Sequence, residues 1–395
     1  MVYVKRELLE PFSKRTEMYR IVAVVGPRQA GKTTFLKQQA SILSAKYVFF
    51  DDPDARNLFE EDIKRFAVQY MSDSLTVLDE VQYCVDAGSK LKYLADAGYT
   101  FWITSSSETL LAKEVLSYLV GRVSILRLYP FSLTEYLRSV GQKEYTEVVL
   151  RRNIFFHCVY GGYPKIVLEP DIDKKKILLS DLKETMILKD VAQTFSIQDV
   201  ASLERFVRFL AYNATNMISY TDVCSDTGLS YPTVKKYEDA LEKSYVISPV
   251  SPYFTNKQKE ISKQPKIYFY DTGLRNSIAG EFVSELTGDL FENYVFCELI
   301  KNNFSVKYWR SKTKQEVDFV LETSSGLVGI EVKLQFKKKH LSSLRSFIRM
   351  HNPSRCFVVT YKGSSDSFIV DGCEVLVCNI QELFSQLLAS CVMKQ

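Results

Sequence analysis

Short apolar runs alternate with helix-like segments in the first third of the chain. The run at residues 21–25 contains five consecutive apolar residues, a pattern typical of a strand buried on both faces of a parallel sheet. Similar runs recur at residues 47–50, 75–78 and 101–104. This alternation predicts a three-layer α/β domain over residues 1–145.

After the first domain, the chain is predicted to be mostly helical. Residues 147–213 read as mostly helical with a break at Gly161-Gly162-Tyr163-Pro164, so we expect a helical lid or connector over residues 146–215. Between Ser219 and Tyr270 two short helices meet at Gly228, followed by a strand, a lysine-rich loop and another strand. This order predicts a winged helix over residues 216–285.

The second helix of the predicted winged helix has two distinct faces. Apolar side chains recur at near-helical spacing and are expected to face the core, whereas charged side chains point outward. The apolar set is Val234, Tyr237, Leu241 and Tyr245, and the charged set is Lys235, Lys236, Asp239 and Lys243.

The last section, residues 286–395, reads helix, strand, strand, strand, helix, strand, helix. We expect it to form a separate α/β domain. With 395 residues, the chain is longer than a single hydrophobic core usually supports, which agrees with several domains.

Composition and charge narrow the class of protein. The chain is 46% hydrophobic and 25% charged, as in globular proteins, and no apolar run approaches the roughly 20 residues of a membrane-spanning helix. We therefore expect a cytoplasmic protein without a membrane partner. The eight cysteines form no Cys-x-x-Cys pair, and the net charge of +4 neither requires nor excludes a polyanionic partner.

A phosphate-binding motif follows the first apolar run. Gly-x-x-x-x-Gly-Lys-Thr between a strand and a helix lets backbone amides close around phosphate oxygens at the helix N-terminus. Lys32 would reach the terminal phosphates and Thr33 would bind Mg²⁺. The predicted ATP-binding residues are Gly26, Pro27, Arg28, Gln29, Ala30, Gly31, Lys32, Thr33 and Thr34.

Two acidic residues end a later apolar run. In Leu-Thr-Val-Leu-Asp-Glu, Asp79 is expected to hold the hydrated Mg²⁺, and Glu80 to orient or deprotonate the attacking water. This pair predicts hydrolysis of ATP in addition to binding. The other interpretation, a glycine-rich turn and two unrelated surface acids, accounts poorly for both motifs in order.

Two further residues are candidates for the same site. Ser105 follows the run at residues 101–104, where it would sense the γ-phosphate or, equally, form part of a simple serine turn. Arg122, in Leu-Val-Gly-Arg, would stabilise transition-state charge within one subunit or across an interface, unless it is an ordinary solvated arginine.

Acidic residues and a lysine recur near the C-terminus. Glu292 lies in a predicted helix, Asp318 follows in Glu-Val-Asp-Phe, and Glu331 and Lys333 share one face of a strand in Gly-Ile-Glu-Val-Lys. Asp318 and Glu331 would bind Mg²⁺ while Lys333 activates water. The alternative is a set of charges on half-exposed strands.

Together these motifs resemble the AAA-type ATPases of bacteria and archaea that carry a winged helix and a C-terminal restriction-endonuclease-like domain. The resemblance spans nearly the whole chain. It rests on the phosphate-binding motif, on Leu-Asp-Glu-Val-Gln at 78–82, on Leu-Tyr-Pro-Phe-Ser-Leu-Thr-Glu at 128–135, on Phe-Tyr-Asp-Thr-Gly-Leu-Arg at 269–275, and on the two C-terminal motifs. It implies catalytic roles for Lys32 and Glu80, and nuclease-like roles for Glu292, Asp318, Glu331 and Lys333.

The sequence leaves three hypotheses for the function. The first is a Mg²⁺-dependent ATPase that acts on DNA, as a homo-oligomer in which Arg122 reaches a neighbour's nucleotide. The second is an ATP-driven switch whose later domains bind protein partners, and the third is an ATP-regulated, metal-dependent nuclease. Lysines that would contact DNA phosphates are Lys235, Lys236, Lys257, Lys259, Lys263, Lys266 and Lys337–Lys339.

Overall fold

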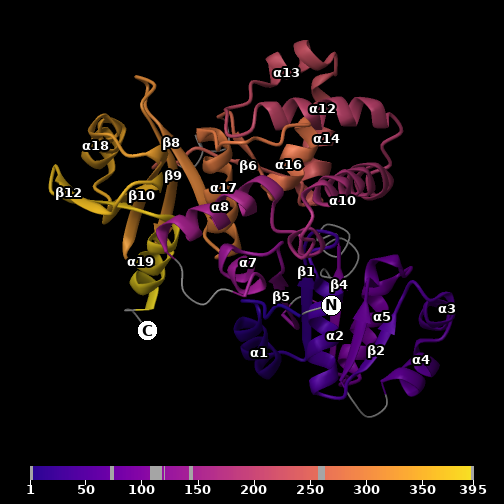
Figure 1. The fold of residues 1–395 in the computed structure, drawn as a ribbon. Helices are drawn as coiled ribbons and strands as arrows, with labels where there is room; N and C mark the ends of the chain where they lie inside the picture. Colours follow the sequence, from indigo (N-terminus) through magenta and orange to yellow (C-terminus); the bar gives the residue numbers. More distant parts are fainter. Residues whose placement is uncertain are drawn as a thin grey trace. The chain divides into compact units, whose positions relative to one another are not determined.

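The computed structural model describes residues 3–71, 75–106, 118–119, 121–141, 146–256 and 263–392 (Figure 1). The chain divides into two compact units. The first contains Met1–Gln142, Gly162–Leu168 and Lys243–Tyr245, and the second contains Lys143–Gly161, Glu169–Glu242 and Val246–Gln395. The four predicted domains therefore do not correspond one to one with the compact units.

The first unit is built on a parallel five-stranded sheet in the order β2-β3-β4-β1-β5. The four strands expected from the sequence are present, and a fifth that we did not predict, β5, pairs with β1. The strands are β1 (Ile21–Val25), β2 (Lys46–Phe49), β3 (Thr76–Asp79), β4 (Phe101–Ser105) and β5 (Val123–Arg127).

Helices cover both faces of this sheet, as expected for a three-layer domain. Ile21, Ala23 and Val25 of β1 belong to one buried apolar cluster, whereas Val22 and Val24 belong to another. Alternate residues of one strand thus serve two cores. The helices of this unit include α1 (Leu9–Met18), α2 (Lys32–Ile42), α3 (Pro53–Glu61), α4 (Ile63–Tyr70), α5 (Ala87–Asp96), α7 (Leu133–Ser139) and α9 (Pro164–Val167), with the short helix η1 (Val81–Tyr83).

The second unit begins with the helical region that the sequence predicts. Several helices end in αL glycines or begin with side-chain caps, as at Asp199, whose carboxylate accepts from the Ser202 amide. The helices are α8 (Glu147–Tyr160), α10 (Ile172–Glu184), η3 (Thr185–Val191), α11 (Ala192–Thr194), α12 (Val200–Tyr212), α13 (Tyr220–Thr227), α14 (Tyr231–Lys243) and α16 (Thr272–Ala279).

Helices α13 and α14 are followed by an antiparallel hairpin of β6 (Ile247–Val250) and β7 (Lys266–Phe269). The elements expected for a winged helix are therefore present, although their assignment to that class stays a prediction. The predicted inner face of α14 is confirmed, since Val234, Tyr237 and Leu241 are buried.

The C-terminal part carries a mixed six-stranded sheet in the order β12-β13-β11-β10-β9-β8. The prediction of a single strand after the second helix was wrong, because three strands follow α18. The elements are α17 (Gly288–Lys301), β8 (Val306–Arg310), β9 (Glu316–Thr323), β10 (Gly326–Gln335), η4 (Lys338–His340), α18 (Leu341–His351), β11 (Arg355–Lys362), β12 (Asp366–Val370), β13 (Cys373–Cys378) and α19 (Ile380–Val392).

The β6–β7 hairpin is attached to this C-terminal sheet and to α17. Tyr253 donates its amide to the Tyr308 carbonyl, and the Tyr308 amide donates to Ser251 at 3.2 Å. The Asn293 side chain contacts both the amide and the carbonyl of Phe269, at 2.9 and 2.8 Å. The two regions predicted as separate domains, residues 216–285 and 286–395, therefore share backbone pairing within one unit.

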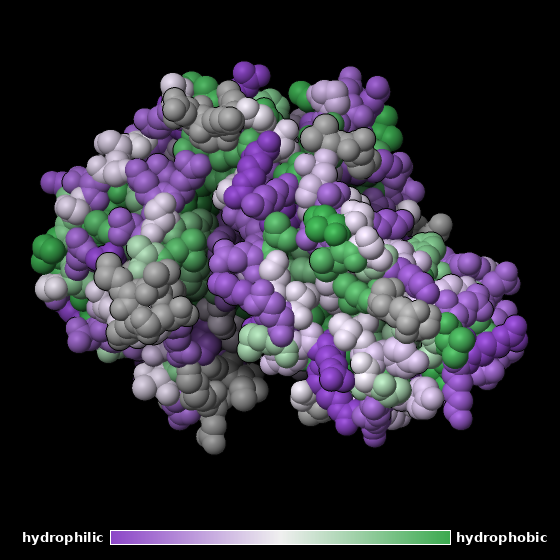
Figure 2. All heavy atoms as spheres, turned by 90° about the horizontal axis from the view of Figure 1, so that it is seen from below, coloured by the Kyte–Doolittle hydropathy of each residue, from purple (hydrophilic) through white to green (hydrophobic). Residues whose placement is uncertain are grey.

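The surface is mixed in character. On the face drawn in Figure 2, hydrophilic side chains are interspersed with small groups of hydrophobic ones. Within the described ranges, no helix combines the length and apolar character needed to span a membrane.

Candidate functional site

The phosphate-binding motif forms a tight loop between β1 and α2. Gly26 has a φ of +146°, and a Cβ there would collide with the Leu128 carbonyl oxygen, so only glycine fits. Gly31, with a φ of +98°, is the N-cap of α2. The loop backbone therefore leads directly into the positive end of a helix, where phosphate binding is favoured.

The Lys32 ammonium closes this loop. It donates to the carbonyls of Gly26, at 2.9 Å, and Pro27, at 3.0 Å, and its side chain is buried. The positive charge is thus held at the mouth of the loop. A phosphate arriving there would take the place of these carbonyls as the acceptor of the Lys32 ammonium.

A buried arginine supports the loop from the N-terminal segment. Arg6 donates to the Ala30 carbonyl at 2.8 Å and to the Tyr129 carbonyl at 2.5 Å, and its guanidinium pairs with Glu135 at 3.0 Å. Arg6 and Glu135 are each about 5% exposed. The Leu-Tyr-Pro-Phe-Ser-Leu-Thr-Glu motif, which ends in Glu135, thus positions the loop through Arg6.

Asp79 and Glu80 are joined to the loop by a hydrogen-bonded chain of side chains. Thr33 donates its hydroxyl to Asp79 at 3.0 Å. The Thr104 hydroxyl donates to the other Asp79 oxygen and accepts from the Glu80 amide at 2.8 Å. Because β4 lies between β1 and β3, the ends of three adjacent strands bring these groups together.

Glu80 is held by a neighbouring amide. Gln82 Nε2 donates to Glu80 Oε2 at 2.5 Å and to the Ser106 hydroxyl at 3.2 Å. Glu80 itself adopts a left-handed conformation with a φ of +58°, which is uncommon for a residue with a side chain. The turn after β3 therefore fixes the direction of the Glu80 side chain.

The residues around Thr33 and Asp79 fit a hydrated Mg²⁺. A hydroxyl and a carboxylate are the oxygen ligands that this ion accepts. The nearby Tyr47 hydroxyl is buried beside Asp79 and Thr33. Burial, together with the Asp79 charge, raises the pKa of Tyr47, so this hydroxyl stays protonated and able to donate.

The two further candidates for the ATP site, Ser105 and Arg122, lie at opposite ends of the sheet. Ser105 ends β4 beside Val25, the residue before the loop. Arg122 precedes Val123, which pairs with Ile21 at the opposite end of β1, and its side chain pairs with Asp96. A five-residue strand spans roughly 16 Å, so the position of Arg122 does not fit a contact with phosphate in the same subunit.

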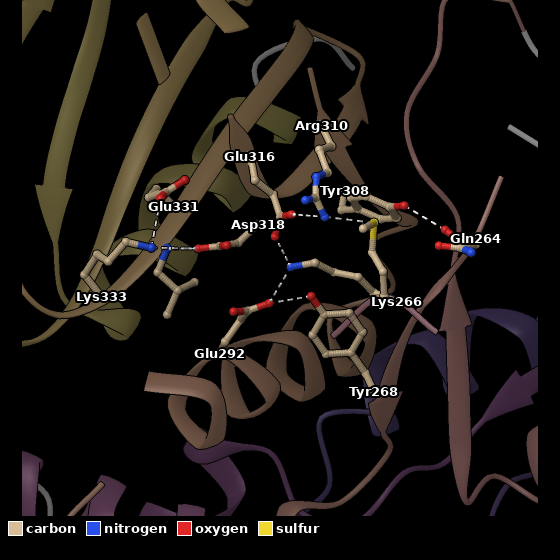
Figure 3. Close-up of polar contacts among 12 residues, drawn as sticks. Gln264, Lys266, Tyr268, Glu292, Tyr308, Arg310, Glu316, Asp318, Glu331 and Lys333 are labelled. Atoms are coloured by element: carbon tan, nitrogen blue, oxygen red, sulfur yellow. Dashed lines mark hydrogen bonds and ion pairs between the residues drawn. The ribbon is translucent and has the colours of Figure 1, made fainter. Parts of the chain in front are cut away.

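A second cluster of charges lies in the C-terminal part (Figure 3). Lys333 of β10 contacts Glu331 at 2.8 Å and Asp318 of β9 at 3.4 Å. Asp318 also accepts from the Val332 amide at 2.7 Å. The predicted convergence of Asp318, Glu331 and Lys333 is therefore present.

Glu292 joins this cluster through a lysine that the sequence did not place there. Lys266 of β7 contacts Glu292 of α17 at 3.2 Å and Glu316 of β9 at 2.5 Å. Tyr268 donates to the same Glu292 oxygen at 2.6 Å, and Arg310 lies 3.6 Å from Glu316. Our assignment of Lys266 to a DNA-contacting surface was wrong, because its side chain is only 4% exposed.

Burial controls the titration of this cluster. It raises the pKa of Glu292 to about 7 and that of Glu331 to about 8, with a further contribution from the Asp318 charge in both cases. Burial alone would lower the pKa of Lys266, but Glu292, Asp318 and Glu316 outweigh it and the pKa is raised. The lysine thus stays charged at neutral pH.

Metal binding by this cluster does not follow from its geometry. In the part of the chain that the structure describes, no three His, Cys, Asp or Glu side chains are arranged to hold a metal ion. The predicted Mg²⁺ ligands Asp318 and Glu331 both contact Lys333 instead.

The other lysines predicted to bind DNA lie in different settings. Lys235 contacts Glu238 at 2.9 Å and lies 3.7 Å from the centre of the Tyr220 ring, whereas Lys236 and Lys263 are exposed. Lys337–Lys339 are also exposed. Lys257 and Lys259 lie outside the described residues.

Comparison with sequence families divides the chain into three parts. Residues 18–137, which contain the loop, Asp79, Glu80 and Thr104, match an AAA domain. The family match therefore lies within the first unit, whose parallel sheet and phosphate-binding loop form a P-loop ATPase-like core. Residues 151–285 match a domain of unknown function (DUF8612), and residues 287–382 match another (DUF4143).

Two relatives align with most of this chain and with most of their own length. An uncharacterised protein of Haemophilus influenzae is 23% identical over 82% of this chain and 84% of its own length. One of Mycobacterium tuberculosis is 25% identical over 88% and 77%. Among solved structures, a Walker-type ATPase of Pyrococcus abyssi covers 70% of this chain and 96% of its own, with 13% identity and a TM-score of 0.46.

Sequence reasoning did not identify three residues that support the candidate ATP site, namely Arg6, Gln82 and Thr104. Thr104 was within reach, because the polar end of the apolar run at residues 101–104 was already singled out and Thr104 closes it. Arg6 gave no such signal, since its partners Ala30 and Tyr129 are 24 and 123 residues away.

Proposed function

We propose that this protein is a Mg²⁺-dependent ATP hydrolase in which Asp79 supports the metal and Glu80 activates water. The hydrogen-bonded chain from Thr33 through Asp79 and Thr104 to Glu80 is the observation that supports it most directly. It links the candidate metal ligands to the backbone of the residue that carries the candidate base. Such preorganisation is what phosphoryl transfer requires of a protein.

Each residue has a distinct part in the proposed reaction. Lys32 releases the loop carbonyls and donates to the terminal phosphates. A bound Mg²⁺ would offset the charge of the β- and γ-phosphates. The Glu80 carboxylate accepts a proton from the attacking water or orients it, and Thr104 keeps Asp79 and the Glu80 backbone in register.

The proposal is tested by ATP turnover of Glu80→Gln. Loss of a general base lowers turnover by about 10²–10⁴-fold, whereas the affinity for ATP, measured with a fluorescent analogue, should persist. Glu61→Gln provides a matched control, because Glu61 is an exposed acid in the same unit. Turnover by Glu80→Gln equal to that of the control would remove Glu80 from the mechanism.

We propose further that DNA is a partner of this ATPase, through the surface of α13 and α14. Lys235, Tyr220 and Tyr231 support this, since the Lys235 ammonium lies over the Tyr220 ring and Tyr231 is 55% exposed. Lysines beside exposed aromatic rings suit phosphates and bases. The pairing of Lys235 with Glu238 reduces the positive charge of this surface.

Salt dependence of binding distinguishes DNA from a protein partner. If DNA is bound, affinity for duplex or branched DNA should fall steeply as salt rises, and Lys236→Ala should reduce the slope. Lys64→Ala, on the first unit, is the matched control. Undetectable binding at low salt would favour the alternative, a nucleotide switch whose second unit binds protein.

A homo-oligomer remains part of this proposal through Arg122. Because Arg122 lies at the end of β5 away from the loop, its proposed role is toward the nucleotide of a neighbouring subunit, and the alternative is a surface arginine paired with Asp96. The surface pair with Asp96 does not hold Arg122 strongly, since such exposed pairs contribute about 0–1 kcal/mol.

A further inference from the structure

The carboxylate cluster of the second unit contains a lysine from an element outside the C-terminal sheet. Lys266 extends from β7 of the hairpin to Glu292 of α17 and Glu316 of β9 (Figure 3). Its neighbours on the strand, Ile267 and Phe269, are buried, and Lys266 itself is 3% exposed. The ammonium is therefore enclosed among the acids and cannot leave without displacement of the hairpin.

We infer that Lys266 is the resident cation of this cluster and that the cluster therefore excludes a divalent metal ion. The inference concerns the second unit alone and does not depend on ATP hydrolysis. A metal-dependent nuclease needs carboxylates that bind a metal ion, and in this cluster the Lys266 ammonium takes that place.

The hydrogen bonds of the acids support this inference. Glu292 accepts from Lys266 and Tyr268, and Glu316 contacts Lys266 and Arg310. Asp318 Oδ2 accepts from the Val332 amide and from Lys333. A metal ion at this point would have to replace N–H and O–H donors that the fold itself supplies.

The charges of the cluster also nearly balance without an ion. Four carboxylates, of Glu292, Glu316, Asp318 and Glu331, face three cations, Lys266, Lys333 and Arg310. One buried carboxylate oxygen, Glu331 Oε2, has no partner in the described part of the chain. A single proton on a carboxyl completes the balance, whereas a divalent ion would exceed it.

The test is Mn²⁺ binding to the full chain, followed by electron paramagnetic resonance. Asp79→Asn is used as the background, so that binding at the ATP site does not contribute. With Lys266 present, no bound Mn²⁺ is expected at millimolar metal. Adding Lys266→Met should create one bound Mn²⁺ per chain, and adding Asp318→Asn to that variant should abolish it.

Lys266→Arg, which keeps a cation, and Lys263→Met, which removes an exposed lysine nearby in sequence, are the matched controls and should bind no Mn²⁺. Bound Mn²⁺ in the background protein that is lost on Asp318→Asn would overturn the inference. So would a folded Lys266→Met variant, checked by circular dichroism, that gains no site. If Lys266→Met does not fold, the inference is decided by the Mn²⁺ measurement on the protein that keeps Lys266: no bound Mn²⁺ supports it, and bound Mn²⁺ that is lost on Asp318→Asn overturns it.

Discussion

The Thr104 hydroxyl donates to the Asp79 carboxylate and so ties the end of β4 to the end of β3. The same oxygen accepts the Glu80 amide at 2.8 Å, so one hydroxyl holds both acidic residues of the site. Thr104→Val keeps the shape and removes both bonds. Hydrogen bonds to charged groups contribute about 1.5–3 kcal/mol, and we therefore expect ATP turnover to fall by about 10–100-fold.

Thr100→Val is the control for this change, because Thr100 lies exposed just before the other end of β4. Its turnover should equal that of the unaltered protein. If Thr104→Val turned over ATP at the same rate as Thr100→Val, Asp79 and Glu80 would be positioned without Thr104.

The buried Arg6–Glu135 pair should stabilise the first unit as well as position its loop. Arg6→Met leaves the Glu135 charge buried without its partner, which costs about 3–5 kcal/mol. We expect a lower midpoint of urea unfolding and weaker ATP binding. Arg6→Met combined with Glu135→Leu should recover part of the stability but not the ATP affinity, since the bond to the Ala30 carbonyl stays lost.

Arg122→Ala should leave the affinity of each subunit for ATP unchanged, because Arg122 lies at the end of β5 remote from the loop. If the side chain acts on a neighbouring subunit, turnover of the unaltered protein should rise with protein concentration, and this rise should disappear in Arg122→Ala. Asp96→Ala, which removes only the surface partner, is the control. Reduced ATP affinity in dilute Arg122→Ala would show that Arg122 acts on the nucleotide of its own subunit and would contradict this prediction.

The carboxylate cluster should make stability depend on pH near neutrality. In the folded chain the pKa of Glu292 is about 7, above its ordinary value of 4.5. The folded chain therefore keeps a proton that the unfolded chain releases. This contribution is complete below pH 4.5 and is lost as pH rises through about 7.

Glu292→Gln removes this titration. Urea unfolding measured from pH 5 to pH 8 should show a declining free energy of unfolding for the unaltered protein and a flatter profile for Glu292→Gln. Glu285→Gln, outside the cluster, should keep the decline. Parallel profiles for the unaltered protein and Glu292→Gln would place the titration on another group.

Local features of the sequence predicted much of the first unit. The run at residues 21–25 became β1 without change, since its pattern depends only on neighbouring residues. The less apolar β5 was missed, because Ser124 and Arg127 interrupt its hydrophobic pattern. The loop residues followed from a motif whose spacing suits phosphate binding, and the closeness of Thr33 and Asp79 followed from their places at the carboxyl ends of two buried strands of one sheet.

The second unit shows where such reasoning stops. Lys266 reads as one more lysine after a polar loop, but it lies on the same face of β7 as Tyr268, and both reach Glu292. Its burial is decided by α17 and β9, which follow much later in the chain. Charge alone could not distinguish this enclosed lysine from the exposed Lys263.

The support of the loop by Arg6 has a consequence for synthesis of the chain. Ala30 emerges from the ribosome soon after Arg6, but Glu135, which fixes Arg6, emerges only after all five strands of the sheet. Until then the arginine has no carboxylate partner at this position. A nascent chain therefore carries the complete phosphate-binding motif well before it carries the means to hold that motif in shape.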